Sequence, residues 1–193
     1  MPNPENRLGD YEVIERIGCG GEAKVFRARC VVDGNPNVDR GELVALKVLT
    51  YSDDDSSSRR FQQRIGLLQS LNHPNIVRYR DSFAWRHGEW DERHCLVMDL
   101  LEGETLEARL ARGGKGLPWT EVRRIFEGCL EGLIYTRSQN VVHLDLKPSN
   151  IFLANDGRVM LIDFGIARRM GSAQTTNFGW RGSFDYMAPD FAT

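Results

Sequence analysis

The chain has 193 residues, 41% of them hydrophobic and 27% charged, which is an ordinary composition for a folded protein of one domain or two small lobes. Its formal net charge of -2 gives no electrostatic reason to expect nucleic acid or an anionic membrane as a partner. No apolar run approaches the roughly 20 residues that span a bilayer, and the start, MPNPENRLGDYE, does not resemble a signal peptide. We therefore expect a cytoplasmic protein without a membrane segment, in which the four scattered cysteines are reduced thiols.

The first hundred residues favour strands. Alternating or continuous apolar runs predict strands at 11–17, 23–32, 43–49, 76–83 and 95–100. One helix is expected at 61–71, where apolar residues recur at steps of three and four, and the proline of HPN (73–75) ends it. The polar segment 85–94 is expected to be a loop between the last two strands.

The second half changes character. A short helix is expected at 105–111 and a long one at 118–138, followed by short apolar pieces at 151–154 and 159–162. The pattern predicts an α+β fold with a strand-rich first half and a helical second half that meet near 101–105. Clefts between such lobes commonly hold ligands.

Two segments of the first half carry candidate binding residues. In IGCGGEAKV (17–25), Gly18 and Gly20 would let backbone N–H groups approach phosphate oxygens, although a glycine-rich hairpin is usually only a hairpin. In VALK (44–47), Lys47 stands in an apolar strand. It either grips phosphate or lies on an edge strand and reaches water.

Two segments of the second half carry candidate catalytic residues. In VHLDLKPSN (142–150), Asp145 could accept a proton, Lys147 could offset phosphate charge, and Asn150 could ligate a divalent cation. In LIDFGIA (161–167), Asp163 follows a strand and could hold the same cation. Taken alone, the first segment could be a helix-entry loop that uses Asp and Asn as turn formers, and the second could be a turn of the Asp-x-Gly type.

Together the four segments resemble the protein kinase family, of the eukaryotic-like serine/threonine type. The resemblance runs from about Asp10 to the end of the chain. It implies a two-lobed fold: an antiparallel-sheet N-lobe with one main helix (about 10–100), a hinge (101–104) and an incomplete, mostly helical C-lobe (105–193). Small-molecule phosphotransferases share the Asp-to-Asn spacing but generally lack the Asp-Phe-Gly step.

The resemblance implies transfer of a phosphoryl group from ATP to serine or threonine hydroxyls of protein substrates, with Mg²⁺. Asp145 would be the catalytic base, Lys147 would steady the transferring group, and Lys47 would hold the α- and β-phosphates. Asn150 and Asp163 would hold Mg²⁺.

The nucleotide site is implied residue by residue. Gly18 and Gly20 would cover the phosphates, and the backbone groups of Asp99 and Leu101 would hydrogen-bond adenine. The other implied nucleotide contacts are apolar side chains: Ile17, Val25, Ala45, Met98 and Phe152. His143 and Phe164, with Leu68, would form part of an apolar stack.

The sequence departs from the family pattern at four positions. Ala23 replaces the third glycine of the loop, and Leu144 replaces the arginine that receives a phosphorylated activation loop. Arg64 stands where a glutamate would pair with the strand lysine, and we expect its side chain to point away from Lys47 because like charges repel. Asp190 stands where the family has glutamate.

These departures leave an alternative open, namely a pseudokinase or nucleotide-binding interaction module without catalysis. The helices that normally follow the segment MAPD are also missing from the chain. We therefore expect Leu130, Leu133 and Ile134 either to be exposed or to be covered by a partner or by a further segment that completes the C-lobe.

Overall fold

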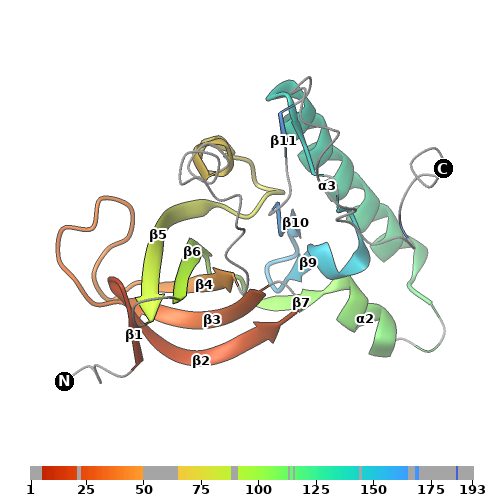
Figure 1. The fold of residues 1–193 in the computed structure, drawn as a ribbon. Helices are drawn as coiled ribbons and strands as arrows, with labels where there is room; N and C mark the ends of the chain where they lie inside the picture. The colour runs from red at the N-terminus through yellow and green to blue at the C-terminus, as the bar shows by residue number, and fades with distance from the viewer. Residues whose placement is uncertain are drawn as a thin grey trace. The chain divides into compact units, whose positions relative to one another are not determined.

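The computed structural model describes residues 6–20, 23–49, 65–87, 91–112, 114, 116–143, 145–164, 168–169 and 186. The chain divides into two compact units, drawn in Figure 1. Unit 1 contains residues 1–70 and 78–101, and unit 2 contains residues 71–77 and 102–193. The expected hinge at 101–104 stays a prediction; residues 71–77, expected with the first lobe, group with unit 2.

Unit 1 is built on a six-stranded antiparallel sheet with the order β1-β2-β3-β4-β6-β5, whose strands are visibly curved in Figure 1. Residues 65–70 are helical, and the expected start of that helix lies outside the described residues. The strands are β1 (Arg7–Leu8), β2 (Tyr11–Cys19), β3 (Ala23–Cys30), β4 (Leu43–Leu49), β5 (Tyr79–His87) and β6 (Asp91–Asp99).

The strand expected at 43–49 is confirmed, but the loop expected at 85–94 is wrong. Strands β5 and β6 continue through most of that segment, with pairing from Trp85↔Arg93 to His87↔Asp91. Backbone hydrogen bonds hold two paired strands together whatever the polarity of their side chains. A polar composition is therefore not sufficient evidence for a loop. Strand β5 also begins at Tyr79 rather than at Ile76, which instead forms an isolated bridge with Leu161 in unit 2.

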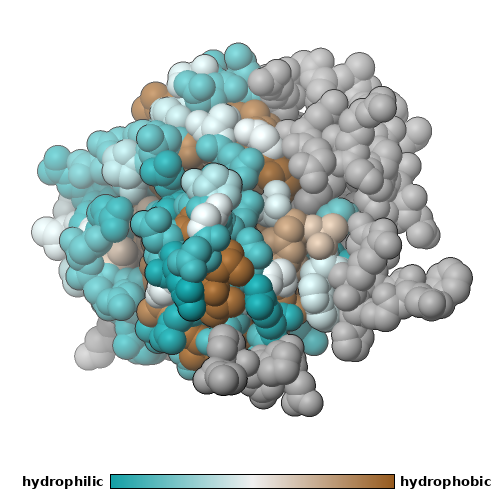
Figure 2. Space-filling model, turned by 90° about the vertical axis from the view of Figure 1, so that its left-hand side faces the viewer, coloured by the Kyte–Doolittle hydropathy of each residue, from teal (hydrophilic) through white to brown (hydrophobic). Residues whose placement is uncertain are grey.

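Alternation along the strands gives the unit 1 sheet a core face. The second-neighbour residues Val44, Leu46 and Val48 of β4 belong to one buried cluster, as do alternate residues of β3 and β6. Burying these side chains together removes apolar surface from water and stabilises the sheet. On the face of the molecule drawn in Figure 2, hydrophilic surface surrounds a narrow hydrophobic band.

Within its described residues, unit 2 contains the helices α2 and α3 and several short strands. Its three-stranded sheet has the order β10-β9-β7, from β7 (Gly103–Thr105), β9 (Ile151–Ala154) and β10 (Val159–Leu161). The expected helices are confirmed within a residue or so as α2 (Leu106–Arg112) and α3 (Trp119–Ser138). The other elements are β8 (Val141–Val142), a 3-10 helix (Pro148–Asn150) and β11 (Arg168–Arg169), which pairs with β8.

Helix α3 packs closely on β10 because glycines lie at the contact. A Cβ at Gly128 would stand 2.8 Å from Cβ of Val159, and one at Gly132 would stand 3.0 Å from Cδ1 of Leu161. The side-chain amide of Asn75 also donates to the carbonyl of Val159 at 2.7 Å. These contacts fix β10, and with it the residues that follow, against the helix.

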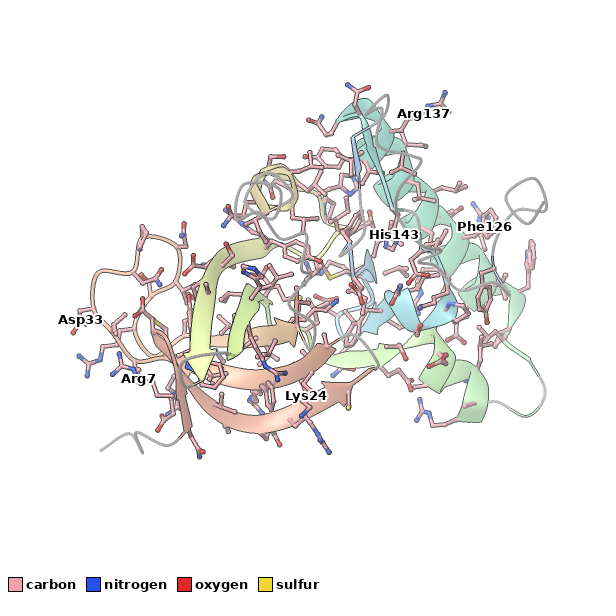
Figure 3. All side chains as sticks on the ribbon, viewed as in Figure 1. Arg7, Lys24, Asp33, Phe126, Arg137 and His143 are labelled. Carbon is pink, nitrogen blue, oxygen red and sulfur yellow. The ribbon has the colours of Figure 1, made fainter. Side chains whose placement is uncertain are left out.

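The opposite side of α3 is apolar and exposed. Leu130 is 45% exposed and Ile134 66%, as expected, whereas Leu133 is half-buried. Phe126, labelled in Figure 3, is also 66% exposed. Among the helices that the structure describes, none is long and apolar enough to cross a membrane. The expected cytoplasmic location stays a prediction.

Candidate active site

Four candidate nucleotide residues of unit 1 share the sheet face opposite its core. Val25 pairs with Lys47, and Ala45 pairs with Met98. Since side chains alternate along a strand, Ala45 and Lys47 point away from the core residues Val44, Leu46 and Val48. The register therefore places Val25, Ala45, Lys47 and Met98 on one face, in two adjacent rows.

Lys47 lies on a central strand rather than an edge strand. Strand β4 pairs with β3 on one side and with β6 on the other, and Lys47 is only 8% exposed. The alternative that this lysine sits at an edge and reaches water is therefore wrong. A buried ammonium needs charged or polar partners, which an anionic ligand can supply.

The backbone conformation around the turn between β2 and β3 does not require glycine at positions 18 and 20. Gly18 pairs with Val25, and the N–H of Gly20 donates to the carbonyl of Ala23 at 2.9 Å. Neither glycine has a positive φ, and a Cβ at Gly20 would meet only that carbonyl oxygen, at 3.9 Å. The described fold would tolerate a side chain at Gly20, so the glycine suits the close approach of a ligand. Ile17, just before this turn, is 48% exposed.

At the end of β6, one backbone group of Asp99 already makes a hydrogen bond within the protein. The N–H of Asp99 donates to the carbonyl of Arg78 at 3.0 Å, so an adenine contact at Asp99 would use its carbonyl. The carboxylate of Asp99 accepts from Nη1 of Arg80 at 3.1 Å. Leu101 is half-buried and is the last residue of unit 1.

In unit 2 the candidate catalytic residues converge on Asp145. Nδ2 of Asn150 donates to Oδ2 of Asp145 at 3.0 Å and to its backbone carbonyl at 2.8 Å. Nζ of Lys147 lies 2.9 Å from the same Oδ2. The 3-10 helix Pro148–Asn150 makes this return possible, because its tight turn brings Asn150, only 5% exposed, back to Asp145.

The backbone of Ile162 joins this loop to the next motif. Its N–H donates to the carbonyl of Asn150 at 3.0 Å, and its carbonyl lies 3.0 Å from Nε2 of His143. Asp163, the following residue, is thereby held beside the loop. Sequence reasoning missed this role of Ile162, since a backbone contact leaves no signal in the residue type.

His143 is a buried, neutral support for the loop. It is 2% exposed, and its ring lies 4.3 Å from that of Phe164, which confirms the expected contact between the two. Burial lowers the pKa of His143, against the opposing effect of Asp163 and Asp145. Leu68, expected in the same stack, belongs to unit 1 and is 4% exposed there. Figure 3 labels His143.

Asp163 has an unusual backbone conformation, with φ at 62°. Asp is one of the few residues other than glycine that enter this left-handed region readily, at a modest cost in free energy. The conformation lets the chain leave β10 and turn sharply, with Asp163 half-buried and Phe164 1% exposed. Phe152, the remaining candidate contact, is half-buried on β9, where it pairs with Met160 and Thr105.

Asn150 and Asp163 fit a hard cation by their chemistry. Because Nδ2 of Asn150 donates to Asp145, the amide presents its oxygen as the ligand atom, and Asp163 supplies a carboxylate. Within the described residues there is no group of three or more His, Cys, Asp or Glu that could hold a metal by itself. A cation here would therefore also need oxygens from its substrate or from water.

Several departures from the family pattern lie outside the described residues. They are Arg64, whose side chain we expect to point away from Lys47, and the substitutions at Leu144 and Asp190. Ala23 is described, and it is 6% exposed at the start of β3. The small side chain fits this buried position.

Comparison with known proteins identifies the class. The family described as "Protein kinase domain" matches residues 11–192, so the chain belongs to the protein kinase family. Family membership implies ATP and a divalent cation.

Among the similar proteins is the serine/threonine-protein kinase PrkC of Bacillus subtilis, 33% identical over 95% of this chain and 27% of its own length. The serine/threonine-protein kinase 36 of Pongo abelii is 34% identical over 93% of this chain and 13% of its own length. The probable serine/threonine-protein kinase PknB of Lactococcus lactis is 31% identical over 94% of this chain and 28% of its own length. The chain thus spans less than a third of these relatives.

Proposed function

We propose that the chain transfers the γ-phosphoryl group of ATP to serine or threonine hydroxyls of protein substrates. The observation that carries the proposal is the convergence of Lys147 and Asn150 on Oδ2 of Asp145. A fixed carboxylate with a neighbouring ammonium is suited to accept a hydroxyl proton beside a charged phosphoryl group. The names of the relatives support serine and threonine as acceptors.

The proposed roles combine these contacts with what membership of the protein kinase family implies. Asp145 accepts the proton as the hydroxyl oxygen bonds to the γ-phosphorus and the bond to the leaving ADP oxygen breaks. Lys147 offsets negative charge on the transferring group, and Lys47 binds the α- and β-phosphates. Mg²⁺, held by Asn150 and Asp163, would neutralise phosphate charge when bound.

The nucleotide contacts are also proposed. Gly18 and Gly20 offer backbone N–H groups to the phosphates, and the carbonyl of Asp99 and the N–H of Leu101 bond adenine. The apolar contacts are Ile17, Val25, Ala45, Met98 and Phe152.

The test is phosphoryl transfer from radiolabelled ATP to a generic protein acceptor, comparing the unmodified chain with Asp145→Asn. We expect the variant to lose transfer by a factor of at least about 100, since general-base catalysis typically supplies that much. ATP should still raise its melting temperature, because Asp145 is not a proposed nucleotide contact. Equal incorporation by the two proteins would overturn the assignment of Asp145.

The second candidate function is a pseudokinase, a nucleotide-binding interaction module. Arg64 favours it, because it stands at the helix position where the family usually has a glutamate. A melting temperature raised by Mg²⁺-ATP, with no transfer by any form of the protein, would support this reading over catalysis. No thermal shift with ATP would count against both functions.

A further inference from the structure

Arg27 occupies an unassigned position on the proposed nucleotide face. In the sheet register it pairs with Ala45 of β4. Its neighbours Phe26 and Ala28 pack in or against the unit 1 core, so alternation turns Arg27 to the opposite face. Residue 27 of β3 thus lies directly beside Ala45 of β4, with its side chain on the face proposed to bind ATP.

Little in the described structure holds this guanidinium. Its Nη1 lies 3.4 Å from Oε1 of Glu15, and the two side chains are 38% and 55% exposed. An exposed pair at that distance contributes little to stability. Nε of Arg27 is buried, and no hydrogen-bond partner for it exists in the described part of the chain. A buried donor without an acceptor is unfavourable, so a rotation that supplies one would be stabilised.

The sheet register also indicates which part of the nucleotide is near. Val25 and Lys47 form the row that continues from the glycine turn, and Lys47 is the proposed phosphate contact. Arg27, Ala45 and Met98 form the next row, which carries the proposed adenine contacts. Successive rows on one face lie about 6.6 Å apart along a strand. The row position places Arg27 with the base and ribose rather than with the phosphates.

We propose that Arg27 contacts the nucleoside part of ATP and turns to donate Nε–H to it. The inference rests on the proposed nucleotide role of this face. A planar guanidinium can donate to a ring nitrogen or a ribose hydroxyl while its plane stacks on a purine, whereas a lysine ammonium can donate but has no plane to stack. Arg27 would then set affinity for the nucleoside independently of the phosphate contacts.

The experiment compares variants of the 193-residue chain by the affinity of each for adenosine, ATP and tripolyphosphate. Arg27→Met should weaken adenosine and ATP by the same factor, about five to twenty, and leave tripolyphosphate unchanged. Lys47→Met should weaken ATP and tripolyphosphate but not adenosine. Arg29→Met is the matched control: Arg29 lies on the same face two residues further along β3, is exposed, and pairs with Leu43.

The outcomes separate the inference from the function on which it rests. If Lys47→Met weakens ATP as expected but Arg27→Met behaves like Arg29→Met, Arg27 is only the partner of Glu15 and the inference is wrong. If the unmodified chain binds neither adenosine nor ATP, the inference and the proposed function both fail. Arg27→Lys tests the donor itself, because it keeps the charge and removes Nε–H; affinity equal to that of the unmodified chain would overturn the role of Nε.

Discussion

The buried imidazole of His143 supports the candidate catalytic loop, because each of its two ring nitrogens makes one polar contact. Nε2 of His143 lies 3.0 Å from the carbonyl of Ile162, and Nδ1 lies 3.4 Å from the N–H of Asp145. The two contacts are satisfied together by the neutral tautomer that carries its proton on Nε2. Protonating Nδ1 would remove an acceptor from Asp145 and place a charge where the ring is 2% exposed.

This geometry predicts a loss of stability in mild acid. Burial lowers the folded-state pKa of His143 from its usual 6.5, so the unfolded chain takes up the proton first as the pH falls. The stability that neutral His143 contributes to the folded protein is therefore fully present above pH 6.5. Below pH 6.5 the free energy of unfolding falls by up to about 1.4 kcal/mol per pH unit, until the folded-state pKa is reached. Urea unfolding of the unmodified chain and of His143→Gln, at several values between pH 5 and pH 8, measures the effect.

The difference between the two proteins isolates His143, because all other titrating groups are common to both. We expect the free energy of unfolding of the unmodified chain to fall more steeply below pH 6.5 than that of the variant. Parallel curves would show that His143 does not titrate differently in the folded and unfolded states.

At the scale of elements, helix α3 was predictable and its contact surface was not. The spacing of apolar residues over 118–138 predicts the helix, which runs from Trp119 to Ser138. The residues that it buries include two glycines, Gly128 and Gly132, whose missing side chains admit β10 and the segment around Asn75. A glycine within a helix ordinarily lowers its stability, so the sequence gives no sign that these glycines allow close packing. Only the packed structure reveals that role.

The close contact predicts opposite effects for the same substitution at two helical glycines. Gly128→Ala should lower the free energy of unfolding by about 1–3 kcal/mol, because its Cβ would lie 2.8 Å from that of Val159. Gly66→Ala is the control: residue 66 is helical and exposed, and nothing lies within 4 Å of its added Cβ. There we expect a gain of about 0.5–1 kcal/mol from helix propensity. Chemical unfolding measures both, and an equal change of the same sign would contradict the packing argument.

At the scale of the whole molecule, each of the two units has its own elements and its own candidate residues. Unit 1 carries the glycine turn and Lys47, and unit 2 carries Asp145, Asn150 and Asp163. Unit 2 also presents an apolar stripe on α3 to solvent, including Phe126, Leu130 and Ile134. Such a stripe raises the tendency of the protein to associate or to bind apolar dyes.

Neighbouring residues of α3 allow a test of this exposed stripe. The double variant Phe126→Gln, Ile134→Gln should leave the free energy of unfolding within about 1 kcal/mol and reduce the fluorescence of a bound hydrophobic dye, since both side chains are 66% exposed. Ile125→Gln, at a position 7% exposed, should cost more than about 2 kcal/mol. If the double variant loses as much stability as Ile125→Gln, the stripe is buried in solution.

The family and the candidate chemistry could be predicted from the residues alone, because glycine, lysine, aspartate and asparagine at fixed spacings leave few alternatives. The sequence also predicted most strands and both helices of the second half from periodicity, which depends on local chain geometry. The folded structure was needed for every feature that depends on contacts between distant segments. It placed Lys47 on a central strand, joined Asn150 to Ile162 through backbone groups, extended β5 and β6 through a polar segment, and brought Arg27 beside Ala45. Backbone hydrogen bonds and sheet register do not require a particular residue type, which is why the sequence alone did not reveal them.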